Sequence, residues 1–581
     1  MADKHHEAGV ARDAPPEFDA PPDFEKGDFE TRDGDVNLRK DQREQDFMTR
    51  NGLNLRSFAR RDRGTGDVEL DRSMKKRHLH MIAIGGSIGA GFFVGSGSAL
   101  TRGGPASIVI CFSIAGIMIF NVVHALGELA VMYPVSGGFY TYSTRFIDPS
   151  WGFAMGYNYV FQWLIVLPLE LVVCSFTVRW WNDNISSAVW ITVFWLVIIF
   201  INVFGTLGYA EEEFWSSALK LSAIVIFMII AVVLVCGGGP ADGLYSEYWG
   251  NRTWQDPGPW RNGFKGFCSV FVTAAFSYSG SELVGLAAAE SANPAQSLPG
   301  AVKQVFWRIV LFYVVGLSLV GLLVPSNHPQ LLNAENPYED GASPFVIAAQ
   351  QAGLRGFDSF LNVVICISVV SIGVSGVYGG SRTLTALAAQ GYAPKIFTYV
   401  DRSGRLLVSV IFVMSWGALA YIALASSGMI VFDWLLSLSG LAALFTWGSI
   451  CVSHIRFRAA WKKQGRSLDR IPFRAIFGVT GSYIGLALCI LILAAQFYVA
   501  LYPPTADGLG TATQALQAIL ALPIVLVFWV CGWLWKRTPF LTLDQIDLDV
   551  GLREHDWEEI NAYRAKVASW PAWRRVLHKV F

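Results

Sequence analysis

The sequence predicts an all-α integral membrane protein with twelve transmembrane helices. Hydrophobic residues fill 53% of the 581 positions and charged residues only 15%, whereas globular domains carry about a quarter charged residues. The charges gather at the two ends and in short breaks between long apolar runs, as in multi-spanning membrane proteins. The 45 basic residues balance the 45 acidic ones, so no net basic charge is available to bind nucleic acid.

Twelve apolar stretches are long enough to cross a hydrocarbon core of about 30 Å at about 1.5 Å per residue. We expect them at residues 79–100, 105–131, 152–178, 187–205, 214–236, 264–289, 305–324, 357–380, 405–425, 429–453, 475–501 and 513–535. The acidic, proline-containing tail at 1–77 has no signal-peptide pattern, and we expect it to be disordered. A second tail spans residues 537–581.

An even number of spans places both tails on the same side of the membrane. The loops after the eighth and tenth segments are basic, so the positive-inside rule predicts that both tails are cytosolic. The acidic loop after the seventh segment, which contains Glu335, Glu339 and Asp340, lies opposite. Two sequons, at Asn184 and Asn251, fall in loops on that outer side and are candidate glycosylation sites.

The first and sixth segments carry polar or glycine-rich interruptions. The first reads IGGSIGAGFFVGSG at 84–97, and the sixth contains SYSGSE at 277–282. These are corresponding positions if the first ten segments form two sets of five, and paired interruptions indicate a transporter site between repeats. Half-helix N–H groups attract a carboxylate and free carbonyls accept from an ammonium, which favours a zwitterionic ligand. The alternative is that both stretches are glycine packing faces.

Three ionisable residues lie inside predicted spans, where a charge is costly. Lys220 stands where a sodium ion would bridge segments and could lose its proton; alternatively it snorkels to the interface. Glu282 directly follows the interruption and fixes its backbone, or carries a proton. Glu170 carries a proton, contacts cationic substrates, or is a paired structural glutamate. Phe276 precedes the interruption and either covers a ligand or belongs to the core.

The eight cysteines are scattered singly in apolar stretches, without a CxxC pair or an accompanying histidine. This pattern supports neither a metal site nor a disulfide framework. No catalytic triad spacing appears in the apolar segments. We therefore expect no enzymatic activity, no metal and no cofactor.

Six motifs resemble the fungal amino-acid permeases, the yeast amino-acid transporter family of the amino acid-polyamine-organocation superfamily, and are closest to its broad-range members. They are IGGSIGAGFFVGSG at 84–97, ALGELAVMYPVSGGF at 125–139, RFIDPSWGFAMGYNY at 145–159, FSYSGSELVGLAAAE at 276–290, SRTLTALAAQGYAPKIF at 381–397 and FTWGSICVSHIRFR at 445–458. The resemblance covers about residues 75–550. It departs from the family at Gly-Val-Ser 373–375, where relatives commonly have a polar pair.

The resemblance implies a leucine-transporter-type fold and import of L-amino acids across the plasma membrane by proton symport. Two inverted five-helix repeats would occupy 78–236 and 263–455, and two extra helices 475–536. The substrate carboxylate would meet the N–H groups of Gly89, Ala90 and Gly91. The ammonium would meet carbonyls near Ile84, Phe276 and Ser279, with Phe276 as the aromatic gate and Ser277 near the substrate side chain. Lys220 matches the lysine that replaces a sodium site.

Alternatives remain for the substrate and the role. A carrier restricted to cationic amino acids or proline is the second reading, and an amino-acid-sensing receptor the third. Regulated endocytosis, which the family also implies, makes the tail lysines Lys4, Lys26 and Lys40 candidate sites for the ubiquitination machinery.

Overall fold

The computed structural model describes residues 53–60 and 74–575, except residues 135–137, 183, 242, 292–293, 333–342, 426–427, 505–507, 539 and 554–556. All of these residues lie in the unit that begins at Gly52. They form helices, turns and loops, and no strand occurs among them; isolated bridges pair Arg60 with Asp401 and Met74 with Ser291. The predicted all-α fold class is therefore confirmed.

The first five predicted segments correspond to a series of helices that includes one short connecting helix, α6. In chain order these are α3 (Lys76–Gly85), α4 (Ala90–Phe93), α5 (Gly95–Met132), α6 (Phe139–Phe146), α7 (Pro149–Arg179), α8 (Ser187–Val203) and α9 (Gly205–Val235). The first predicted segment is divided among α3, α4 and the start of α5. Asp148 caps α7 by accepting from the N–H of Trp151, and Pro149 occupies its first turn, which is a standard helix start.

The boundary between the first two predicted segments, at residues 101–104, coincides with a kink inside α5, where two helices meet. Gly104 has φ 82° and ψ 168°, outside the helical region, and Pro105 follows it without an N–H to donate. The helical hydrogen bonds are interrupted at this point, because the N–H of Ala106 donates to the carbonyl of Pro259 and the carbonyl of Gly103 accepts from the N–H of Arg261. One helix therefore follows the other directly, without a loop between them.

The remaining segments follow the same pattern. They are α10 (Arg252–Gln255), α11 (Gly263–Tyr278), α12 (Leu283–Ala288), α13 (Pro294–Trp307), the π-helix η2 (Arg308–Gly316), α14 (Leu317–Leu323), α15 (Pro329–Leu332), α16 (Pro344–Gln351), α17 (Phe357–Ala389), α18 (Leu407–Ser415), the 3-10 helix η4 (Trp416–Leu424), α19 (Gly428–Lys463), α20 (Gly478–Leu501), α21 (Ala512–Ile519), α22 (Ala521–Lys536) and α23 (Trp557–Ala568). The short 3-10 helices η1 (Leu55–Phe58), η3 (Lys395–Thr398) and η5 (Leu468–Arg470) lie in connecting stretches.

Nine helical runs in the described part of the chain are long and apolar enough to span a membrane. The pair α21 and α22, bent by 55°, would make a tenth. Two predicted spans are absent from this set for identifiable reasons: the first is divided by its break, and the fourth is α8, which is only 17 residues long. A multi-span membrane fold is thus confirmed, and the number twelve stays a prediction.

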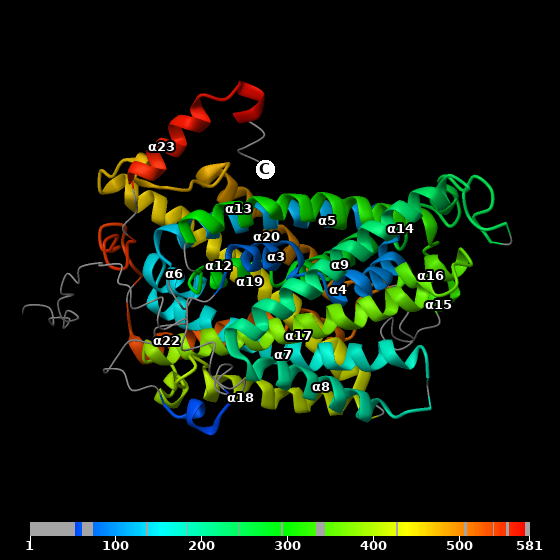
Figure 1. Ribbon diagram of the computed structural model, residues 1–581, viewed down its shortest axis with the longest axis horizontal. Coiled ribbons are helices and arrows are strands. Elements are labelled where there is room, and N and C mark those ends of the chain that lie inside the picture. Colours follow the sequence, from blue (N-terminus) through cyan, green and yellow to red (C-terminus); the bar gives the residue numbers. More distant parts are fainter. Residues whose placement is uncertain are drawn as a thin grey trace, which may run out of the picture. The chain divides into compact units, whose positions relative to one another are not determined.

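Burial separates central helices from peripheral ones. The most apolar stretch of α7 is 94% buried, whereas that of α20, a helix without any charged residue, is 28% buried. Figure 1 shows α7 between α17 and α8, both of which it contacts. Exposed side chains on α8 and α9 are largely apolar, such as Phe200 and Ile229. Helices that are apolar on all faces are typical of membrane spans, where the outer face meets lipid.

Candidate functional site

The first predicted interruption lies between α3 and α4. Residues 86–89 are not helical, and the N–H of Ile88 donates to the carbonyl of Gly85 at 3.0 Å. The N–H groups of Gly89, Ala90 and Gly91 have no hydrogen-bond acceptor among the described residues. The first N–H groups of a helix lack partners within the helix, so these three donors are available to a ligand.

The second predicted interruption lies between α11 and α12, at residues 279–282. Gly280 has φ +90°, which favours glycine, and lets the chain leave the helix sharply. The Ser281 hydroxyl donates to the carbonyl of Tyr278 at 2.6 Å, and the N–H of Gly280 donates to Glu282 Oε1 at 3.3 Å. Small polar side chains thus replace helical hydrogen bonds within the break.

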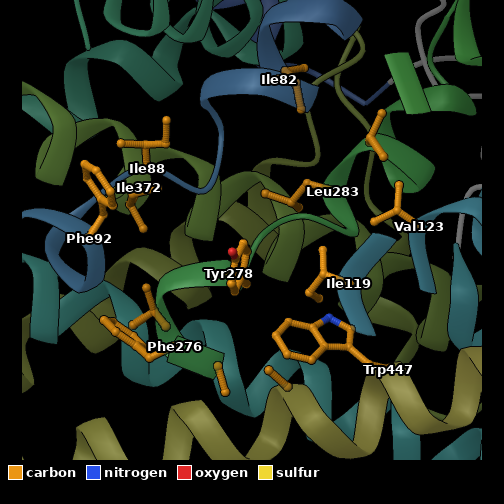
Figure 2. Packing of buried hydrophobic residues seen from close by; sticks show 14 of the residues in the cluster. Ile82, Ile88, Phe92, Ile119, Val123, Phe276, Tyr278, Leu283, Ile372 and Trp447 are labelled. Carbon is orange, nitrogen blue, oxygen red and sulfur yellow. The ribbon is translucent and has the colours of Figure 1, made fainter. Parts of the chain in front are cut away.

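The two breaks meet. A Cβ atom added to Gly91 would lie 2.8 Å from both Cδ1 of Phe276 and the backbone Cα of Ser277. A Cβ atom on Gly280 would lie 3.2 Å from the carbonyl oxygen of Gly86. Figure 2 shows the two non-helical stretches, one between the helices that carry Ile82 and Phe92 and the other between Tyr278 and Leu283. Such close approach is possible only because glycine has no side chain.

A pocket lies at this meeting point. It is a small cavity of about 10 Å³, lined by Ser87, Gly89, Ala90, Gly91, Trp163, Val166, Glu170, Phe276, Ser279 and Ile372. Six of the residues that the sequence singles out therefore come together here. Ile84 and Ser277 do not line the pocket: Ile84 is half-buried at the end of α3, and the Ser277 hydroxyl donates to the carbonyl of Thr273 at 2.7 Å.

Trp163 and Val166 were not expected in the site. They precede Glu170 by seven and four positions on α7, a spacing that places all three on one helical face. If Glu170 is placed in the pocket, this spacing predicts that Trp163 lies there as well. Ile372, on α17, carried no comparable signal, because its position depends on how α17 packs against α4.

Glu170 lies in the pocket without a partner. Its Oε2 atom is buried and makes no hydrogen bond to any described residue, and no described cation lies within ion-pair distance. A carboxylate in such a position is costly unless it is protonated or a ligand supplies the missing charge. Lys220 acts electrostatically on Glu170 from beyond ion-pair distance, so the three roles given for Glu170 stay predictions.

Lys220 lies behind the pocket and joins three helices. Its ammonium nitrogen is 3.4 Å from the carbonyl of Gly85 at the end of α3 and 3.1 Å from the hydroxyl of Ser371 on α17. The side chain is completely buried. It points into the protein, so the snorkelling alternative does not describe this structure.

The comparisons with known proteins agree with this arrangement. The family model "Amino acid permease" matches residues 78–545. The chain belongs to the amino acid permease family. Amino-acid permease inda1 of Hypocrea atroviridis is 64% identical over 93% of this chain and 94% of its own length. General amino-acid permease GAP1 of Saccharomyces cerevisiae is 48% identical over 88% of this chain and 86% of its own length. Cationic amino acid transporter 1 of Schizosaccharomyces pombe is 49% identical over 85% of this chain and 83% of its own length.

This permease also contains a buried acid that the sequence analysis missed. Glu213 lies seven residues before Lys220 on α9, with its carboxylate 3.6 Å from the Lys220 ammonium. It accepts hydrogen bonds from the hydroxyls of Ser217 and Ser371, each at 2.7 Å, and from Ser375 at 3.3 Å. Seven residues correspond to about two helical turns, so Glu213 and Lys220 share a face. The spacing was visible, but Glu213 fell one residue outside the predicted span.

Glu282 contacts both the break and a neighbouring helix. One carboxylate oxygen accepts from the N–H of Gly280, and the other accepts from the indole of Trp447 on α19 at 3.0 Å. These contacts are those that a structural role for Glu282 requires, and its role in proton carriage stays a prediction; Trp447 is labelled in Figure 2. Glu282 does not line the pocket.

Other predicted features lie away from the pocket. Asn184 and Asn251 are exposed in the loops before α8 and α10, whereas Thr253, the third residue of the second sequon, is buried. Lys4, Lys26 and Lys40 lie outside the described residues, as do Glu335, Glu339 and Asp340. At the far end of α5, Glu128 is buried, pairs with Arg458 at 2.5 Å and lies 3.1 Å from a ring nitrogen of His454.

Proposed function

We propose that this permease is a secondary active transporter that imports L-amino acids across the plasma membrane by proton symport. Membership of the amino acid permease family supports amino-acid transport. The observation that carries the proposal is the pocket between the two breaks, which combines three unpaired N–H donors with a buried, unpaired carboxylate. Hydrogen-bond donors and a negative charge in one small pocket can bind the carboxylate and the ammonium of a zwitterion.

In this proposal the substrate carboxylate binds the N–H groups of Gly89, Ala90 and Gly91. The substrate ammonium binds backbone carbonyls, of which those of Ile84 and Ser279 have no donor among the described residues. The Phe276 carbonyl already accepts from the N–H of Ser279 at 3.0 Å and has one lone pair left. The Phe276 ring lines the pocket and packs against α4, which suits a lid over the substrate.

Proton coupling is assigned to the charges behind the pocket. The Lys220 ammonium holds the carbonyl of Gly85 and the hydroxyl of Ser371, the positions at which a cation would link the first broken segment to α17. Loss of its proton would weaken both contacts and release α3 from α17. The conformational change would be a rocking of the bundle that contains the broken helices, with residues 78–236 and 263–455 as inverted repeats.

Broad specificity is the favoured range. Recognition through backbone N–H and carbonyl groups is independent of the substrate side chain, and two relatives at 48% and 49% identity are named general amino-acid permeases. A carrier for cationic amino acids is the second candidate, because Glu170 offers a negative charge inside the pocket. A proline-restricted carrier and an amino-acid-sensing receptor have no comparable observation in their favour. Both termini are assigned to the cytosol by the positive-inside rule.

Transport by the purified protein in proteoliposomes tests the proposal. An inward proton gradient should drive accumulation of labelled leucine above the external concentration, and a protonophore should abolish it. When each of the twenty amino acids is added in excess, those with neutral and those with charged side chains should both inhibit the uptake of labelled leucine. Uptake that is insensitive to the gradient would refute symport, and inhibition by lysine and arginine alone would select the cationic carrier.

Lys220→Ala gives a sharper test of the coupling residue. The variant should lose gradient-driven accumulation while retaining exchange of labelled for unlabelled substrate, because exchange needs no net proton movement. A variant that accumulates leucine as the wild type does would remove Lys220 from the coupling mechanism. Lys463→Ala serves as the control, since Lys463 is exposed and pairs with Asp544 at the protein surface.

A further inference from the structure

Arg308, a completely buried arginine, lies beside both breaks but does not line the pocket between them. Arg308 is the first residue of the π-helix η2. One guanidinium nitrogen donates to the carbonyl of Ala83 on α3 at 2.8 Å, and another donates to the hydroxyl of Ser281 in the second break at 2.5 Å. Arg308 therefore contacts both broken segments.

Arg308 forms no ion pair with any described carboxylate, and its Nε atom has no hydrogen-bond partner among the described residues. A buried cation is strongly disfavoured unless other groups supply negative charge. Glu282, which follows the second break, acts on Arg308 from beyond ion-pair distance. Ala83 lies in the last turn of α3, whose carbonyls form the negative end of the helix dipole. The positive charge of Arg308 is thus balanced by groups on both broken segments, which ties its stability to the positions of those segments.

Tyr313 makes the same pair of connections five residues further along η2. Its hydroxyl is 2.7 Å from the carbonyl of Ser277, on the second broken segment, and 3.2 Å from the carbonyl of Ser87, in the first break. In an α-helix, residues five apart point about 140° away from each other. In a π-helix the bonded residues are five apart, so Arg308 and Tyr313 share a face. The unusual helix therefore brings both side chains to the breaks.

We propose that Arg308 is a positioning residue for the substrate and that Tyr313 assists it. Together they hold the two broken segments at a fixed separation. Arg308 donates one hydrogen bond to each segment, whereas the single hydroxyl hydrogen of Tyr313 goes mainly to the carbonyl of Ser277, with the carbonyl of Ser87 further away. That separation sets the distance between the N–H groups of Gly89–Gly91, which bind the substrate carboxylate, and the carbonyls of Ile84 and Ser279, which bind its ammonium. Neither Arg308 nor Tyr313 lines the pocket, so neither contacts the substrate.

The inference rests on the proposed function, because it assigns the donors and acceptors to the two ends of an amino acid. It goes further by predicting how the affinity changes. The contacts of Arg308 position the groups that bind the carboxylate and ammonium, which all amino acids share. Loss of Arg308 should therefore lower the affinity for every substrate by the same factor. A residue of the side-chain pocket would instead change the ranking of substrates.

Uptake kinetics for glycine, leucine and arginine test this inference. Arg308→Gln should raise KM for all three by the same factor, at least about tenfold, since it removes two charge-assisted hydrogen bonds. Arg308→Lys retains the charge and one donor and should recover part of the affinity. Arg458→Gln is the matched control: it removes a buried arginine that pairs with Glu128, and it should leave KM unchanged.

Two further variants separate positioning from folding. Tyr313→Phe removes only a hydroxyl and should raise KM uniformly even if Arg308→Gln fails to fold. Ser281→Ala removes one partner of Arg308, so its effect on KM should be less than additive with that of Arg308→Lys. An unchanged KM in Arg308→Lys and Tyr313→Phe, or a rise confined to one substrate, would overturn the inference. Absence of amino-acid uptake by the wild type would instead refute the proposed function itself.

Discussion

The ammonium nitrogen of Lys220 lies 3.6 Å from a carboxylate oxygen of Glu213, and both side chains are fully buried. The pair lies next to the end of α3, one of the two helices that the first break separates. Two buried charges stabilise each other only while both are present, because each alone would face the cost of desolvation without compensation. The pair therefore offers a direct test of how this region is held together.

Single removals of this pair should destabilise the protein more than a joint removal. Lys220→Met and Glu213→Gln each leave a buried charge unpaired, which typically costs about 3–5 kcal/mol. The double variant should recover a clear part of that loss. Thermal unfolding of the detergent-purified protein measures the effect. Lys463→Met, in an exposed ion pair with Asp544, is the control and should change stability by about 1 kcal/mol or less. Additive losses in the double variant would show that the two charges do not interact.

Gly91→Ala should impair substrate binding. The added Cβ would lie 2.8 Å from the backbone of Ser277, and backbone atoms cannot move aside easily, so the two breaks must separate. We expect a rise in KM for all amino acids, measured by uptake of labelled substrates. Gly448→Ala, in α19, is the matched control, because its nearest neighbour would be Leu486 Cδ1 at 3.8 Å, an ordinary contact. An unchanged KM in Gly91→Ala would contradict the placement of the substrate between the breaks.

Glu170→Gln should separate cationic from neutral substrates. The variant retains the size of the side chain and removes its negative charge from the pocket. If Glu170 pairs with cationic side chains, lysine and arginine should lose roughly tenfold in affinity and leucine should lose little. If Glu170 instead carries the coupled proton, accumulation of all substrates against a gradient should fall together. An unaltered transport profile for every substrate would exclude both roles.

How much the sequence could predict depends on the kind of information needed. Both breaks were predictable, because glycines at 85, 86, 89 and 91 and the polar residues at 277–282 disfavour a continuous apolar helix whatever surrounds them. The resemblance also assigned Gly89, Ala90, Gly91, Phe276 and Ser279 to a site, and these residues do line one pocket. Local composition was sufficient in these cases.

Other features required knowledge of the packed structure. Glu213 follows two other glutamates, so its neighbourhood has the composition of a loop, although α9 begins at Gly205 and carries all three acids within a helix. Arg308 lies near the edge of an apolar run, where an arginine normally reaches the interface. Only the π-helical turn directs it inward, and no periodicity in the sequence reveals that turn.

The segment after α22 makes another prediction. Ile546 and Leu548 are buried, and the Tyr133 hydroxyl, next to the end of α5, donates to the carbonyl of Leu548 at 2.9 Å. Leu548→Asp should place a charge in this apolar contact and release the segment from the helices, which faster proteolysis of the C-terminal region would report. Val550→Asp is the matched control, because Val550 is 68% exposed. Equal cleavage rates in the two variants would contradict an anchoring role for Leu548.

The attachment of the segment after α22, which the ion pair between Arg466 and Asp549 supports, should weaken only at low pH. A hydrogen bond from Arg466 lowers the pKa of Asp549 below its ordinary value of 3.8. The ion pair therefore contributes fully at every pH above 3.8, and its contribution is lost as the pH falls through the lowered pKa. Proteolysis rates of the segment should be constant from neutral pH down to that value. A change near neutral pH would show that groups other than Asp549 control the attachment.

The most direct test of the central claim is simultaneous measurement of proton and amino-acid influx in proteoliposomes. With equal pH on both sides, addition of external leucine should acidify the lumen at a rate proportional to leucine uptake, and neither flux should occur without the protein. Lys220→Ala should abolish the acidification. Leucine uptake by the wild type without any lumenal pH change would contradict proton symport through this site.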